Sequence, residues 1–174
     1  MHGFLLINKP TGMTSHDVIN RLRRITGIKR IGHAGTLDPL ATGLLLVGVS
    51  REATREMQKL QGLDKTYEAT FVFGGTSDTD DIDGVVTTVE NLPDLTKNRV
   101  QEALPDFTGD IKQVPPNYSA IKVKGKKLYE LARAGKEIKA QSRDVSIRSI
   151  QIESLTKSEL GFEAEMVISC STGT

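Results

Sequence analysis

The order of hydrophobic and polar residues predicts a strand and a helix near the N-terminus. Residues 4–7 are all apolar and are followed by a proline and a glycine, which end a short buried strand. A helix then begins at Thr14 or Ser15 as its cap and ends at Gly27, because apolar residues recur at helical spacing: Val18, Ile19, Leu22 and Ile25. The chain is therefore predicted to begin with a strand followed by a helix.

The middle of the chain predicts both extended and helical elements. Residues 32–39 form a loop, since two glycines and a proline interrupt any period, and residues 43–49 form a fully buried strand. We expect a helix over residues 52–60, a strand over residues 66–73 and an acidic turn over residues 78–84.

The last part of the chain determines the expected fold class. A helix capped by Thr96 is followed by a strand over residues 118–123, a turn at Gly125 and a helix over residues 127–134. Residues 145–152 read as a strand whose alternation breaks once, which indicates a bulge, and residues 162–170 alternate cleanly. We predict an α+β fold in one globular domain over residues 1–174, with a mainly antiparallel mixed sheet flanked by helices and loops.

Composition excludes several classes of protein. With 37% hydrophobic and 26% charged residues, the chain can bury a core and is not disordered. It has no apolar run of membrane-spanning length and no secretory signal, so we expect a soluble cytoplasmic protein. A single cysteine, Cys170, can build neither an internal disulfide nor a thiolate metal site.

The net charge of +1 conceals an uneven distribution. Residues 76–110 carry nine acidic side chains against two basic ones, whereas residues 111–149 carry ten basic side chains against three acidic ones. A second basic cluster comprises Arg21, Arg23, Arg24, Lys29 and Arg30. Such clusters are typical of a phosphate-binding face and equally of ordinary solvated surfaces.

Asp38 lies in the most unusual segment, a glycine-rich loop over residues 30–43. Pro39 forces Asp38 out of the helical region, which could present its carboxylate to a cleft, although Asp-Pro also occurs in ordinary turns. His33 precedes it by five residues and fits either an RNA-stacking role beside Arg30 or a simple hydrogen bond to backbone. The three histidines lack metal-ligand spacing.

The remaining motifs give little support for a metal, nucleotide or nucleophile site. The acidic turn fits a calcium loop poorly, because Thr79 occupies the first ligand position and the flanks read as strands. The chain has no glycine-rich nucleotide signature and no serine-nucleophile elbow. Lys9 and Pro10 are expected to shape the base of the Asp38 loop, and Ser15 is interpreted as a helix cap rather than a nucleophile.

The three tyrosines of the chain lie in two further segments. Tyr67 begins a predicted strand, where a half-buried position is usual. Tyr118, Lys122 and Tyr129 interleave as in single-stranded nucleic-acid sites, although packing on a hairpin explains the two tyrosines as well.

Five segments together resemble the bacterial tRNA pseudouridine synthase B (TruB) family. They follow the family's order over most of the chain: Ile7-Asn-Lys-Pro-Thr-Gly-Met-Thr-Ser15, Gly32-His-Ala-Gly-Thr-Leu-Asp-Pro-Leu-Ala-Thr-Gly43, Lys65-Thr-Tyr67, Thr76-Ser-Asp-Thr-Asp-Asp-Ile-Asp-Gly84 and Pro115-Pro-Asn-Tyr-Ser-Ala-Ile-Lys122. The Gly-Thr-Leu-Asp-Pro block is the most specific. The acidic block favours the stand-alone bacterial enzymes over their guide-RNA relatives.

The resemblance implies a pseudouridine synthase fold and the isomerisation of uridine 55 in the T loop of tRNA. It implies that Asp38 is the catalytic aspartate, that Tyr67 packs against the target base, and that His33 lies against the RNA. Arg30 and Lys122 are possible RNA contacts. No cofactor, metal or protein partner is expected, and we expect a monomer. Asp38 would act as a nucleophile at C1′ or as a base at C2′, and the sequence does not choose between them.

The chain departs from the family pattern after Thr174, where a tyrosine and an arginine that pairs with the aspartate would follow. A C-terminal RNA-binding PUA domain is missing as well. We therefore expect an N-terminal fragment with weak or absent turnover. The rival interpretations are an RNA-binding or tRNA-chaperone module that does not need Asp38, and a calcium-binding domain built on residues 78–90.

Overall fold

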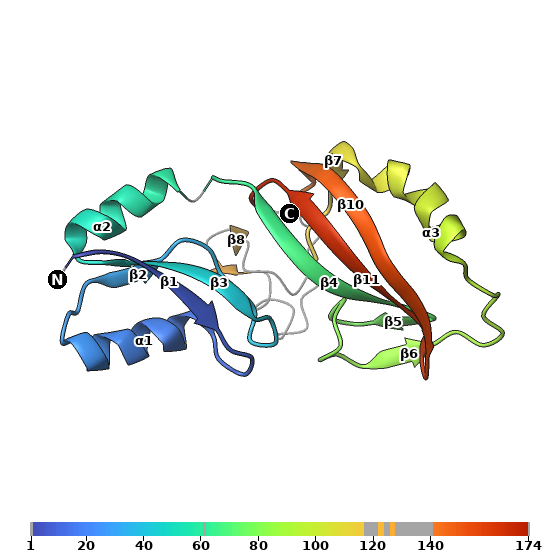
Figure 1. Ribbon diagram of the computed structural model, residues 1–174, viewed down its shortest axis with the longest axis horizontal. Coiled ribbons are helices and arrows are strands. Elements are labelled where there is room, and N and C mark those ends of the chain that lie inside the picture. The colour runs from blue at the N-terminus through green and yellow to red at the C-terminus, as the bar shows by residue number, and fades with distance from the viewer. Residues whose placement is uncertain (1, 61, 117–121, 124–125, 128–140, 174) are drawn as a thin grey trace. The chain divides into compact units, whose positions relative to one another are not determined.

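The computed structural model describes residues 2–60, 62–116, 122–123, 126–127 and 141–173. The chain separates into two compact units, Met1–Leu63 and Asp64–Thr174, each with its own sheet and helices (Figure 1). The hydrophobic pattern did not predict this division, because it shows which positions are apolar and not which sheet each strand joins.

The first unit contains a three-stranded antiparallel sheet in the order β1-β3-β2. β1 (Gly3–Lys9) pairs along its whole length with β3 (Gly43–Val49), so that Lys9 lies opposite Gly43. β2 (Ile31–His33) pairs with the end of β3. The predicted loop over residues 32–39 was therefore wrong at its start, because pairing with β3 makes a strand of residues whose local sequence favours a loop.

Helix α1 (Ser15–Thr26) packs against one face of this sheet. Its buried Val18 and Ile19 contact the apolar side chains of β2 and β3 that point the same way: Ile31, Leu45, Val47 and Val49. The predicted helix is confirmed, with Thr14 as its cap and Gly27 in the left-handed conformation at its end.

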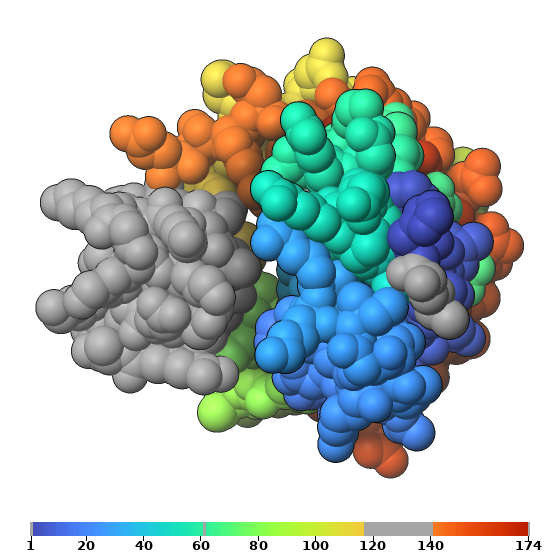
Figure 2. Space-filling view, turned by 90° about the vertical axis from the view of Figure 1, so that its left-hand side faces the viewer, coloured from blue at the N-terminus to red at the C-terminus, as the bar shows by residue number. Residues whose placement is uncertain are grey.

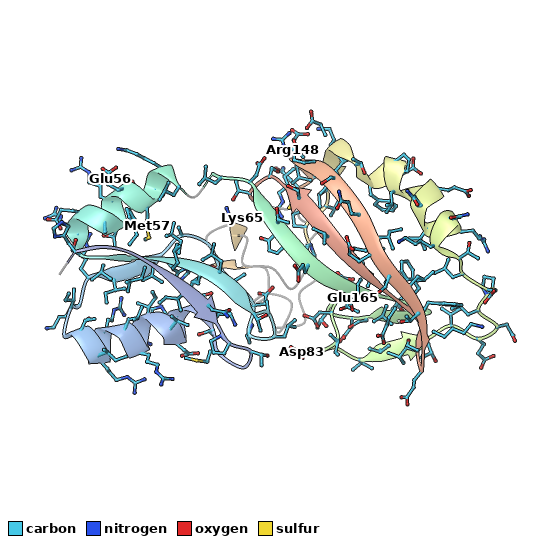
Figure 3. All side chains as sticks on the ribbon, viewed as in Figure 1. Glu56, Met57, Lys65, Asp83, Arg148 and Glu165 are labelled. Atoms are coloured by element: carbon cyan, nitrogen blue, oxygen red, sulfur yellow. The ribbon has the colours of Figure 1, made fainter. Side chains whose placement is uncertain are left out.

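Helix α2 (Arg51–Glu56), continued by the 3-10 turn η1 (Met57–Lys59), follows β3 directly. Met57 is buried against Gly48, where an added Cβ would lie 2.9 Å from the methionine sulfur, and Figure 3 labels this side chain. The helical period over residues 52–60 is thus split into α and 3-10 turns. Full burial of residues 43–49 was wrong, since Leu44 is 67% exposed in this unit.

The second unit is built on a four-stranded antiparallel sheet in the order β4-β11-β10-β7. The strands are β4 (Lys65–Phe73), β11 (Gly161–Cys170), β10 (Arg143–Ser158) and β7 (Gly109–Gln113). The register of β10 against β11 shifts between Ile147 and Ser149 and again between Ile152 and Ser154. The bulge that the broken alternation predicted is confirmed.

Helix α3 (Lys97–Ala103), capped by Thr96, is followed by the 3-10 turn η2 (Leu104–Phe107). Val100 of α3 packs with Ala164 and Met166 of β11, and side chains of β4 and β10 surround them. The clean alternation over residues 162–170 is confirmed as a strand, and buried apolar residues of β11 pack in one core with Val100 of this helix.

Two small hairpins complete the described structure. β5 (Gly75–Ser77) pairs with β6 (Val86–Thr88), and β8 (Lys122–Val123) pairs with β9 (Lys126–Lys127). The helix predicted to start at Lys127 was wrong there, because Lys127 is in β9; residues 118–121 and 128–134, with Tyr118 and Tyr129, lie outside the described residues. Among the described residues, no helix is long and apolar enough to cross a membrane.

Candidate functional site

Asp38 lies in the loop between β2 and β3, and its side chain is exposed. Gly35 and Gly43 bracket this loop at φ values of 118° and 111°, which side-chain-bearing residues rarely adopt. The carboxylate is displayed at the surface of a constrained loop.

The buried side chain of Lys9 hydrogen-bonds the backbone of the Asp38 loop. Its side chain is 0% exposed, and its Nζ donates to the carbonyl oxygens of Pro10 (3.0 Å), Met13 (2.7 Å) and Pro39 (3.3 Å). Three carbonyl acceptors satisfy the three protons of a buried ammonium group. The prediction that Lys9 shapes the base of the loop is confirmed.

Neighbouring residues of the segment after β1 add further bonds to the same loop. The amide of Gly12 donates to the carbonyl of Pro39 (2.8 Å), and the hydroxyl of Thr11 donates to the carbonyl of Leu40 (3.1 Å). Residues 9–15 and residues 37–40 are thereby fastened together although about thirty residues separate them in the chain.

Ser15 was interpreted as a helix cap, and this was wrong. The capping box of α1 is formed by Thr14 and Asp17, whereas Ser15 is the first helical residue and is 2% exposed. The Ser15 hydroxyl accepts a hydrogen bond from the amide of Leu37 (2.9 Å) and donates one to its carbonyl (3.1 Å). It therefore contacts the residue immediately before Asp38.

His33 ends β2, and its Nδ1 hydrogen-bonds the carbonyl oxygen of Gly35. Because a carbonyl only accepts, Nδ1 carries the proton in this arrangement. The backbone-bonded interpretation of His33 is confirmed, and an RNA contact by the rest of the ring stays a prediction.

Arg30 lines an open groove of about 670 Å³ in the first unit. The groove runs between the residues around the end of α1 and one face of α2 and η1, and its lining residues are Arg23, Lys29, Arg30, Ile31, Arg51, Thr54, Arg55 and Gln58. Figure 2 turns this side of the unit to the viewer, with α2 in cyan-green above the blue residues of α1 and its following segment. Five of the eight lining side chains are cationic and none is acidic.

The groove is electropositive because the nearby carboxylates are engaged outside it. The hydroxyl of Ser50 donates to Glu52 (2.7 Å) and Lys59 pairs with Glu56 (2.7 Å), and these hydrogen bonds hold the pKa of both carboxyls below the usual 4.5. Within the described part of the chain, the side chains of Lys29 and Arg30 make no hydrogen bond or ion pair. Arg51 and Arg55 were not predicted as part of a site, although their helical spacing with residues 54 and 58 places them on one face of the helix.

Arg23 has a different role within the groove. Its guanidinium donates to the carbonyls of Lys29 (3.0 Å) and Ile31 (3.2 Å) and to the side chain of Asn20 (3.1 Å). It thus fixes the backbone that carries Lys29 and Arg30, so the cations are displayed on an ordered segment.

Tyr67 and Lys122 belong to the second unit. Tyr67 lies opposite Ile168 in the register of β4 with β11 and is 41% exposed, as is Phe71 four residues further along β4. Lys122 lies in β8, and its side chain is outside the described residues. The structure therefore gathers Arg30, His33 and Asp38 in one unit and places Tyr67 and Lys122 in the other.

Two carboxylates of the acidic turn accept hydrogen bonds from residues in or next to the turn. Asp78 accepts from the amide of Val85 (2.7 Å), and Asp81 accepts from the Thr79 hydroxyl (2.6 Å) and the amide of Asp83 (3.0 Å). Strands β5 and β6 flank it, as predicted, rather than the helices of a calcium-binding hand. Among the described residues, no group of three or more His, Cys, Asp or Glu side chains could hold a metal ion.

Comparison of folds gives solved structures with the same architecture. The chain matches a crystal structure of a Cbf5–Nop10–Gar1 complex with a TM-score of 0.69 at 24% sequence identity, over 99% of this chain and 40% of that one. A structure of an H/ACA RNP bound to a substrate RNA containing 2′-deoxyuridine matches with a TM-score of 0.65 at 22% identity. The predicted α+β pseudouridine synthase fold is confirmed.

Comparison of sequences identifies the family. The tRNA pseudouridine synthase B of Acaryochloris marina is 49% identical over all of this chain and 59% of its own length, and that of Paenarthrobacter aurescens is 41% identical over all of this chain and 56% of its own. The chain thus spans a little under 60% of the length of these relatives. Residues 23–174 match the model of the TruB family pseudouridylate synthase N-terminal domain, and the chain belongs to this family.

Proposed function

We propose that this chain carries the catalytic region of a tRNA pseudouridine synthase that isomerises uridine 55 in the T loop of tRNA. The observation that carries the proposal is the exposed Asp38 on a loop whose backbone is hydrogen-bonded on both sides of it. A reacting group must be held in a narrow range of positions, and these bonds supply that constraint. Membership of the TruB family gives the substrate class.

The reaction requires no net addition or loss of atoms in the base and sugar. The N1–C1′ bond of uridine breaks, the base turns while bound, and C5 joins C1′; the C5 proton passes to water and N1 gains a proton. Asp38 acts either as the nucleophile at C1′ or as the base that removes the C2′ proton. No cofactor takes part in either path.

His33 and Tyr67 are the proposed contacts to the nucleoside and its loop. His33 is anchored through Nδ1 to Gly35, which fixes its ring beside the Asp38 loop. Tyr67 presents a partly exposed ring, of the kind that stacks on a base displaced from its helix. Both residues are expected to affect RNA positioning more than the chemical step.

The cationic groove is the proposed contact to RNA phosphates in the first unit. Arg30, Lys29, Arg51 and Arg55 face a common space without an acidic neighbour in its lining, which favours an anionic polymer. Lys122 is proposed as a further RNA contact. The protein is proposed to act on tRNA in the cytoplasm, as a monomer and without a protein partner.

Tritium release tests this function. A T-arm stem-loop labelled with tritium at C5 of its target uridine is incubated with the full-length protein that contains this sequence and, separately, with the 174-residue chain. We expect the full-length protein to release tritium to water and Asp38→Asn to abolish release while RNA affinity changes less than about threefold. Asp106→Asn, which removes an exposed carboxylate from the second unit, is the matched control and should keep full activity.

The outcomes separate the enzyme from its main rival. RNA binding without tritium release by the full-length protein would replace the enzyme with an RNA-binding or chaperone function. Equal release by Asp38→Asn and its parent would remove Asp38 from the mechanism. Release by the 174-residue chain itself would show that the expected loss of turnover was wrong.

A further inference from the structure

Ser15 makes a pair of hydrogen bonds that helix formation does not require. The start of α1 is already capped by Thr14, whose hydroxyl accepts from the amide of Asp17 (3.1 Å) while Asp17 accepts from the amide of Thr14 (3.0 Å). The Ser15 hydroxyl is turned instead to the Asp38 loop, where it bonds both polar groups of the Leu37 backbone. These two contacts span 22 residues of chain.

Hydrogen bonds hold the backbone on both sides of Asp38, and those of Ser15 hold the side that precedes it. On the far side, Lys9 and Gly12 both donate to the carbonyl of Pro39. The carbonyl of Asp38 itself accepts from the amide of Ala41 (3.1 Å). Residues before and after the aspartate are therefore both held, and the side nearer to α1 depends on Ser15.

The Asp38 carboxylate depends on this backbone for its direction. Within the described part of the chain it makes no hydrogen bond or ion pair, so no neighbouring side chain there orients it. The position of its Cα and Cβ then follows from the peptide groups on either side. A shift of about 1 Å in such a group can lower a catalytic rate about 100-fold.

We propose that Ser15 is a positioning residue for the isomerisation, acting through Leu37 on the orientation of the Asp38 carboxylate. The proposal rests on the proposed catalytic function of Asp38. The burial of Ser15 supports this proposal. Ser15 is only 2% exposed, so water cannot replace its hydroxyl as the partner of Leu37 without a rearrangement of the structure. Loss of the hydroxyl leaves the Pro39 side attached and frees the Leu37 side, so the carboxylate can pivot.

The test measures single-turnover rate and RNA affinity separately in the full-length protein. Ser15→Ala should lower the rate of pseudouridine formation about 30- to 100-fold, with the RNA dissociation constant changed less than about twofold. Ser15→Thr keeps a hydroxyl and should recover most of the rate. Thr14→Ala removes the helix cap one residue away and should lower the melting temperature while keeping the rate within about twofold.

Amide hydrogen exchange at Leu37 supplies a readout independent of activity. The Leu37 amide should be protected in the parent and in Thr14→Ala and should exchange faster in Ser15→Ala, because its acceptor is gone. If the parent forms no pseudouridine, the proposed function fails, and unchanged Leu37 exchange in Ser15→Ala would overturn the attachment as well.

The remaining outcomes are equally decisive in an active parent. A rate for Ser15→Ala equal to that of the parent would overturn the positioning role. Equal rate losses in Ser15→Ala and Thr14→Ala would assign the effect to the start of α1 rather than to Leu37. A loss of affinity in Ser15→Ala that accounts for the whole rate change would also contradict the proposal.

Discussion

Lys9 has an unusual environment for a lysine, because its whole side chain is buried and its charge faces only backbone carbonyls. Burying an ammonium group is costly unless hydrogen bonds replace its water. Here those bonds join residues 10–13 to Pro39, so one side chain serves both the packing of the first unit and the shape of the Asp38 loop.

Replacement of Lys9 should therefore cost stability as well as activity. Lys9→Met keeps the length of the side chain but removes the donor to three carbonyl oxygens. We therefore expect the free energy of unfolding to fall by about 2–4 kcal/mol. Urea denaturation followed by circular dichroism measures this change. Lys59→Met, which removes an exposed ammonium group paired with Glu56, is the control and should cost less than about 1 kcal/mol. Similar losses in the two variants would contradict the structural role of Lys9.

At the scale of single elements, caps determine where helices begin more sharply than hydrophobic spacing does. Among the residues that the structure describes, Thr14, Ser50 and Thr96 cap α1, α2 and α3 through side-chain oxygens that accept hydrogen bonds from backbone amides. Asp17 strengthens the first cap, and the hydrogen bond from the Thr14 hydroxyl, together with that from its amide, lowers the pKa of Asp17 below 3.8. Protonation of Asp17 in acid is therefore expected to weaken this cap.

The direction of this pH dependence follows from linkage. A carboxyl group whose pKa is lower in the folded protein stabilises it above the unfolded pKa, and this stabilisation is lost as the pH falls through the folded value. The melting temperature of the parent should thus exceed that of Asp17→Asn near neutral pH, and the difference should shrink as the pH falls below 3.8. Thermal unfolding of both proteins between pH 6 and pH 3 checks this. A difference that does not depend on pH would show that the ionised carboxylate is not involved.

At the scale of the whole molecule, the first unit carries an excess of positive charge. Residues 1–63 contain nine lysines and arginines against four aspartates and glutamates, and the groove collects five of these cations. Long-range attraction of RNA phosphates is the expected consequence, and it weakens as salt screens it.

Neutralising groove residues should weaken RNA binding and reduce its salt dependence together. Arg30→Gln and Arg51→Gln are each expected to raise the dissociation constant about 3- to 10-fold and to lower the slope of log affinity against log salt by about one. Arg21→Gln removes the same charge from an exposed position of α1 outside the groove and should change affinity less than about twofold. Filter binding at several salt concentrations measures both quantities. Equal effects of all three variants would show that net charge, and not the groove, attracts the RNA.

The sequence by itself determined the features that depend on neighbouring residues. The cap and end of α1, the acidic turn between strands and the bulge in β10 all follow from local spacing and local sterics. The family resemblance rests on the same local motifs, and the comparisons bear it out.

Only the tertiary structure decided which distant segments meet. The periodicity of the strands does not show which sheet each strand joins. Strand β2 forms in a segment that locally favours a loop, because that segment pairs with β3. Ser15 meets Leu37, Lys9 meets Pro39, and residues 23–31 share a groove with residues 51–58 because the β1–β3 pairing and the packing of α1 and α2 bring them together. Hydrophobic spacing reports which way a side chain faces along its own element, whereas these contacts depend on how separate elements pack.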